Sequence, residues 1–197
     1  MLSYRPVKTN QQTSTPADRA LVLKQIYQQI LERQPYVSER RQLADLEQNF
    51  INGKIGIRHF LKTLAISPLY LEKFYENSSN VKFIENAFKH FLGRQPQNEE
   101  EIRYCDNLLL REGVGAMISS LVDSEEYRKT FGCSTVPHWR KDAYDSPSAY
   151  LENHLLQTEH AGQRGWAVPT LYWHELHLDC YAGHCRPAFG YSTRIRS

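Results

Sequence analysis

One order of short motifs occurs twice in this 197-residue sequence, and that duplication constrains its fold more than any other feature. Residues 26–35 read Ile-Tyr-Gln-Gln-Ile-Leu-Glu-Arg-Gln-Pro, and residues 87–96 read Ala-Phe-Lys-His-Phe-Leu-Gly-Arg-Gln-Pro. Further along, residues 67–74 align with residues 124–131, and each segment begins with Ser and ends with Phe. Short helices can resemble one another by chance, but two matched anchors in the same order are not expected to do so. We therefore predict two similar units that pack on one shared core.

Apolar positions between the anchors also correspond in the two copies. The matched residues are Phe60, Leu61 and Leu64 in the first copy and Met117, Ile118 and Leu121 in the second. The first copy carries four more residues between its anchors, which is about one helical turn.

The apolar residues recur at steps of three and four, as in amphipathic helices. The first helix is expected to start at Ala17 and to be closed by Pro35, because a residue before proline is disfavoured in the helical region. Gly93 is expected to end a later helix in the same way as other C-terminal glycines. No stretch alternates apolar and polar residues over a strand's length, so the predicted fold class is all-α. The further helices are expected at about 38–50, 57–65, 67–75, 79–92, 98–111, 114–122 and 124–130.

The chain divides into three parts by composition. Residues 1–16 form an N-terminal arm rich in Pro, Thr and Gln, and residues 17–140 form the duplicated helical domain, with copies at about 26–74 and 87–131. Residues 141–197 form a C-terminal extension in which Pro and Gly interrupt the helical pattern, apart from one short helix expected at about 148–159.

Charge and composition exclude several classes of protein. The net charge is +2 and the basic residues are interleaved with acidic ones, which is not typical of a nucleic-acid-binding surface. A hydrophobic fraction of 41% is enough for a real core. We expect no secretory signal and no membrane-spanning segment, because no apolar run approaches the required length. Four cysteines without a secretion signal are expected to be reduced thiols.

Three segments of the second copy carry a family resemblance. They are residues 88–94 (Phe-Lys-His-Phe-Leu-Gly-Arg), residues 121–127 (Leu-Val-Asp-Ser-Glu-Glu-Tyr), and Phe131-Gly132 followed by residues 135–137 (Thr-Val-Pro). Together they resemble the signature of the phycobilisome linker polypeptide family. The resemblance covers about residues 17–140. The opening residues 2–6 and the single module with its extension are similar to the rod–core type. The sequence of the module is also similar to the repeated modules of the core–membrane linker.

The resemblance implies a structural role in a light-harvesting antenna. A linker of this kind joins and orients phycobiliprotein rings, namely allophycocyanin and/or phycocyanin hexamers, meets other linkers, and tunes energy transfer. It would bind no cofactor covalently but would contact the bilin chromophores of its partner subunits. The expected location is the cytoplasmic (or plastid stromal) face of the thylakoid membrane, with only peripheral membrane contact through the assembly.

Exposed aromatic and arginine residues are the expected anchors for such partners, because these side chains dominate the energetics of interfaces. Most of the candidates lie in the arm and in the extension, where they would be buried only against another molecule, and two lie at the end of the helical domain. The candidates are Tyr4, Arg5, Trp139, Arg140, Trp166, Tyr172 and Trp173.

The His- and Cys-rich end of the extension could instead bind zinc, since both residue types are zinc ligands. The candidate ligands are His174, His177, Cys180 and Cys185, but their spacing fits no standard zinc finger, and a contact strand is the simpler interpretation. Cys105 and Cys133 could attach a bilin, yet small buried or loop cysteines explain them more simply, so we expect no attachment.

An enzyme is not expected from this sequence. It contains no Gly-rich phosphate loop, no nucleophile elbow and no HExxH motif. A generic helical scaffold or adaptor would fit the duplicated unit equally well, and only the family resemblance separates it from a linker.

Overall fold

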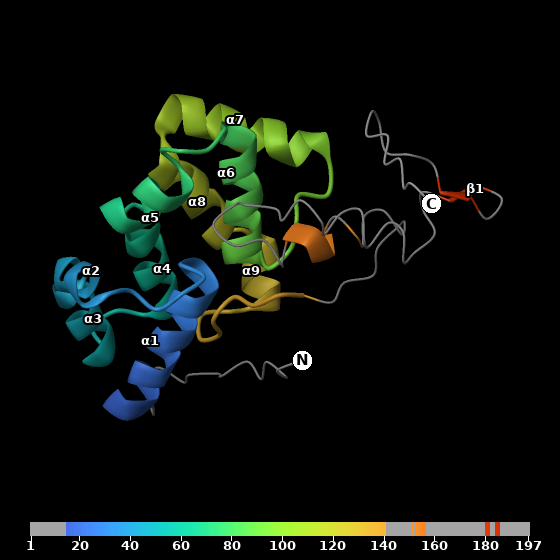
Figure 1. Cartoon of the computed structure of the whole chain (residues 1–197). Helices are drawn as coiled ribbons and strands as arrows, with labels where there is room; N and C mark the ends of the chain where they lie inside the picture. The colour runs from blue at the N-terminus through green and yellow to red at the C-terminus, as the bar shows by residue number, and fades with distance from the viewer. Residues whose placement is uncertain (1–14, 141–150, 152, 157–179, 182–183, 186–197) are drawn as a thin grey trace.

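The computed structural model of the chain describes residues 15–140, 151, 153–156, 180–181 and 184–185 (Figure 1). The described part is helical apart from two short strands, which confirms the predicted all-α fold class. The helices of the first copy are α1 (Pro16–Ile30), α2 (Val37–Gln42), α3 (Ala44–Ile51), α4 (Ile57–Ala65) and α5 (Pro68–Phe74). Those of the second copy are α6 (Asn80–Ala87), the π-helix η1 (Phe88–Leu92), α7 (Glu99–Glu112), α8 (Val114–Val122) and α9 (Glu125–Thr130).

Polar side chains cap the start of half of these helices. Each of five residues accepts a hydrogen bond from a backbone N–H in the first turn, and thereby satisfies a donor that the helix leaves free. Pro16 and Pro68 occupy first-turn positions, where a missing N–H costs nothing. The five capping residues are Thr15, Ser67, Ser79, Asn98 and Ser124.

The first helix ends earlier than the proline pattern predicted. α1 stops at Ile30, and the chain reverses at Glu32, whose φ of 59° lies in the left-handed region. Pro35 therefore follows the turn rather than making it. Gly93, the counterpart of Glu32, has a φ of 69° and ends η1, as expected.

The second helix of each copy differs between the two units. The single helix expected at 38–50 is divided at Leu43 into α2 and α3. The corresponding segment of the second copy is the continuous 14-residue helix α7. The break does not take up the first copy's four extra residues, because these lie in the loop 52–56 between α3 and α4, where the second copy has only Gly113 between α7 and α8.

Both copies contribute equivalent side chains to one core, as the duplication predicts. α4 packs against α8, and α1 packs against η1, so the contacts join the same elements of the two units. In Figure 1, α4 and α8 lie in the middle of the helical body, between α2 and α3 on one side and α7 on another. The buried pairs at matched positions include Phe60 and Met117, Leu64 and Leu121, Tyr70 and Tyr127, and Phe74 and Phe131.

Parts of the C-terminal extension are also described. Residues 151 and 153–156 are helical, in agreement with the short helix predicted at about 148–159. Strands β1 (Cys180–Tyr181) and β2 (His184–Cys185) pair antiparallel and are the described exception to the helical pattern. Among the described residues, none of the helices is long and apolar enough to cross a membrane.

Candidate partner-binding site

The repeated Arg-Gln-Pro motif forms a corner that ties one helix end to the start of the next helix. Arg33 donates to the Gln34 carbonyl at 3.1 Å and pairs with Glu39, in the first turn of α2, at 2.5 Å. Arg94 donates to the Gln95 carbonyl at 2.8 Å and pairs with Glu101, in the first turn of α7, at 2.7 Å. The duplicated arginine therefore has the same structural role in both copies.

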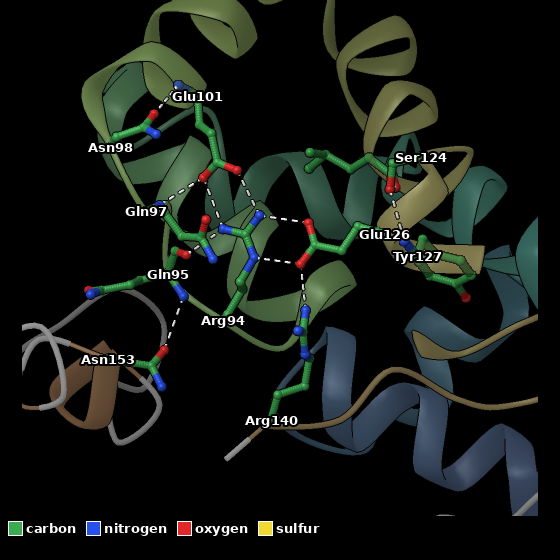
Figure 2. A network of polar contacts seen from close by, with 11 residues as sticks. Arg94, Gln95, Gln97, Asn98, Glu101, Ser124, Glu126, Tyr127, Arg140 and Asn153 are labelled. Carbon is green, nitrogen blue, oxygen red and sulfur yellow. Dashed lines mark hydrogen bonds and ion pairs between the residues drawn. The ribbon is translucent and has the colours of Figure 1, made fainter. Parts of the chain in front are cut away.

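The second corner carries a larger charge network than the first (Figure 2). Arg94, only 5% exposed, also pairs with Glu126 of α9 at 2.6 Å, and Glu126 in turn pairs with Arg140. Burial favours the neutral form of the Glu126 carboxyl, but Arg94 and Arg140 outweigh this effect and hold its pKa below the ordinary value. The network fixes residue 140 against the second copy.

The chain after α9, residues 131–140, lies across this corner and is here called the strap. The Arg140 backbone N–H donates to the Gly93 carbonyl at 3.0 Å. The extension helix contacts the same corner, where Asn153 Oδ1 accepts from the Gln95 N–H at 3.0 Å. Leu151, Leu155 and Leu156 of this helix are buried. The second corner is therefore covered by the chain itself.

Contacts between the two copies are charged as well as apolar. The Glu32 carboxylate at the end of α1 pairs with Lys89 and lies 3.3 Å from Nε2 of His90. Gln29 donates to the carbonyls of Lys89 and His90 at 3.1 and 3.3 Å. The Gln29 side chain of α1 thus supplies hydrogen bonds to backbone carbonyls of η1, which belongs to the other copy.

A second charged contact joins α4 to the end of α8. Arg58 and Lys62 both pair with Asp123, the residue that follows α8. Burial alone would raise the pKa of Asp123, but the two cations hold it below the ordinary value. The counterpart of Asp123 in the first copy is Ile66, which lies against Gly115 of α8.

Two of the predicted partner-binding residues fall within the described part. Trp139 is 37% exposed, and its ring meets that of His154 at 5.9 Å. Arg140 belongs to the intramolecular network, so a role for it in partner binding stays a prediction. The other candidates, Tyr4, Arg5, Trp166, Tyr172 and Trp173, lie outside the described residues.

The candidate metal and bilin sites can be placed only in part. His174 and His177 lie outside the described residues, and of Cys180 and Cys185 only the backbone is described. Within the described residues no group of His, Cys, Asp or Glu could hold a metal ion.

The two described cysteines differ in environment. Cys105 is buried in α7, where burial raises the pKa of its thiol to about 11 and keeps it protonated at neutral pH. Cys133 is exposed in the strap.

One exposed apolar pair was not predicted from the sequence. Tyr36 and Val37, at the first corner, are 66% and 73% exposed. Their counterparts in the second copy are Gln97 and Asn98. Comparing the two copies position by position would have shown an apolar pair where the duplicated unit tolerates polar residues.

The sequence of this chain is similar to those of known proteins. The family model for the Phycobilisome Linker polypeptide matches residues 14–140, which is the whole duplicated unit. The chain is similar to proteins named Phycobiliprotein ApcE. It is 38% identical to that of Aglaothamnion neglectum over 66% of this chain and 15% of the relative. The corresponding values are 40%, 60% and 10% for Nostoc sp., and 37%, 69% and 19% for Synechococcus sp.. The chain thus spans a fifth or less of these relatives, and it belongs to the phycobilisome linker polypeptide family.

Proposed function

We propose that this chain is a non-enzymatic linker that joins and orients phycobiliprotein rings in the phycobilisome. The observation that carries the proposal is the family match over residues 14–140, since it coincides with the folded helical unit. The name of the relatives, Phycobiliprotein ApcE, supports a phycobiliprotein environment. The resemblance to modules of the core–membrane linker favours a position in the core or at the junction of rod and core.

The physical basis of joining is a rigid helical body with charged and aromatic residues at its surface. A net charge of +2 favours encounter with acidic partner surfaces. Buried aromatic anchors would then supply most of the affinity. Trp139 is a suitable anchor, because the strap on which it lies is tied to the body next to it at Gly93. Trp166, Tyr172 and Trp173 of the extension, and Tyr4 and Arg5 of the arm, are proposed as further anchors.

The same proposal includes a role of the chain in tuning energy transfer and a location for the chain. A linker seated in a ring would contact the bilins of its neighbours and change their surroundings without holding a pigment itself. The chain would lie at the cytoplasmic or stromal face of the thylakoid membrane, bound through the assembly.

Truncation tests this role. Removal of residues 157–197 keeps the helix that covers the second corner, so the body should stay folded while rod attachment and energy transfer weaken. Replacement of Trp166 and Trp173 by Ala should reproduce part of the loss, at about 2 kcal/mol or more each if they are hot spots. Normal assembly of the truncated chain would assign the joining to the helical body alone. Failure of the full chain to associate with any phycobiliprotein would contradict the proposal.

A further inference from the structure

Helix α2 is unusual because it buries none of its own residues. A six-residue helix does not form in isolation, since nucleation is costly and its few hydrogen bonds do not compensate. Ion pairs hold it in place instead: Arg33 with Glu39 at 2.5 Å, and Arg40 with Glu47 at 2.6 Å. The fold thus maintains a helix that adds nothing to the core.

The start of this helix presents an apolar pair to solvent. Tyr36 and Val37 are exposed, whereas the same positions of the second copy hold the exposed polar residues Gln97 and Asn98. The duplicated fold therefore does not require apolar side chains here. Adjacent apolar residues that folding does not require are typical of contact surfaces.

The exposed tyrosine is held in one orientation before any partner arrives. The Arg33 guanidinium lies 4.3 Å from the centre of the Tyr36 ring, and Glu39 binds that guanidinium through both oxygens, at 2.8 and 2.5 Å. Glu39 also accepts from the Tyr36 backbone N–H at 2.6 Å. Preorganisation of this kind reduces the entropy cost of binding.

The same surface carries an excess of positive charge. Arg33 is paired with Glu39 and Arg40 with Glu47, so the excess positive charge of this surface comes from Arg41. Arg41 is exposed and forms no ion pair within the described part of the chain. In Figure 1, α2 lies at the edge of the body away from the extension helix. An acidic partner is favoured, and a second copy of this chain is disfavoured, because a symmetric contact would bring the like charges together.

We propose that the surface formed by Arg33, Tyr36, Val37, Arg40 and Arg41, here called the α2 corner, docks on an acidic face of an allophycocyanin ring. Tyr36 and Val37 enter an apolar recess of the ring, and Arg41 meets a carboxylate at its rim. This inference rests on the proposed function and specifies its contact surface.

Equilibrium binding of the full chain to purified allophycocyanin tests the aromatic part. Tyr36→Ala should raise the Kd about tenfold, as expected for an aromatic anchor. Tyr104→Ala is the matched control, because Tyr104 is a tyrosine of similar exposure (59%) on α7; its Kd should change less than about twofold. Thermal unfolding of each variant verifies that the fold is retained.

Association rates test the charged part. Arg41→Ala should slow association about threefold or more at low salt, and the difference should disappear at about 0.5 M salt, where surface charges are screened. Arg111→Ala, at an exposed position of α7, is the control and should have a smaller effect.

The outcomes separate this inference from the proposed function. If the full chain binds allophycocyanin and the Tyr36 and Arg41 variants bind like their controls, the α2 corner is not the contact. If the full chain prefers phycocyanin, the chosen occupant is wrong while the linker role stands. If it binds neither phycobiliprotein, both proposals fail.

Discussion

Glu32 and Gly93 occupy the same position in the two copies, and the neighbours of each explain why the residues differ. Both have a positive φ, 59° and 69°, so both turn the chain after a helix. A Cβ atom on Gly93 would lie 2.0 Å from the His138 carbonyl oxygen of the strap, so only glycine fits. Glu32 has no such strap above it, and its side chain reaches Lys89 in the other copy. One turn geometry thus serves two different environments.

The wider difference between the corners follows from this one position. The second corner is closed by the strap and by Asn153 of the extension helix. The first corner stays open and shows Tyr36 and Val37 to solvent. Duplication therefore produced one copy that anchors the chain's own C-terminal part and one copy whose surface is available to another molecule.

The most damaging change is expected at Gly93. Gly93→Ala should destabilise the protein by about 4 kcal/mol or more, because the strain of a positive φ is added to a collision with backbone that cannot rotate away. Urea unfolding measures the loss. Gly132→Ala is the control: its φ is also positive, 63°, but its nearest neighbour would be 4.0 Å away. It should cost only about 1 kcal/mol, and equal losses would refute the role of the strap.

Replacing the arginines of the two corners should give the second-largest difference in stability. Arg94→Ala leaves the carboxylates of Glu101 and Glu126 without their shared cation in a largely buried site, which should cost about 3 kcal/mol. Arg33→Ala removes a pair that is 27% and 19% exposed, and should cost about 1 kcal/mol or less. Urea unfolding of the two variants under identical conditions gives the comparison. Similar costs would show that burial of the network does not matter.

The helices and the shared core could be predicted from the sequence, because they depend on the duplicated motifs, on local spacing and on the apolar pattern. The sequence could not place the end of α1, because a glutamate in the left-handed conformation depends on a distant lysine rather than on its own preference. The break at Leu43 was missed for a similar reason, since the apolar pattern continues through it. Tyr36 could not be identified from the sequence, because the exposure of a side chain is a property of the packed molecule.

A pH-dependent difference is expected at His90, whose counterpart in the first copy is Gln29. His90 is fully buried between the Tyr70 hydroxyl, 3.0 Å from Nδ1, and the Glu32 carboxylate; Lys89 and Lys73 also face it. Burial lowers the pKa of His90, and Glu32 offsets this only in part. The folded protein therefore resists protonation, whereas the unfolded chain takes up a proton below about pH 6.5.

Stability should fall as the pH decreases from about 7.5 to 5, by on the order of 1 kcal/mol from this residue. His90→Gln, which copies the first unit, should remove that part of the dependence. Urea unfolding at the two pH values measures it. Carboxyl groups titrate mainly below this window, so an unchanged slope in the variant would mean that His90 is protonated in the folded protein as readily as in the unfolded chain.

The smallest expected difference concerns the residues that begin α7 and α2. The Asn98 side chain accepts from the Glu101 N–H at 3.0 Å, whereas the Tyr36 side chain makes no capping hydrogen bond. Asn98→Ala should therefore cost about 1 kcal/mol. Tyr36→Ala loses only an exposed stack on Arg33, about 0.5 kcal/mol. Urea unfolding at neutral pH resolves the two values. A larger loss for Tyr36→Ala would make Tyr36 a structural residue of α2, and its exposed ring would then need no partner to explain it.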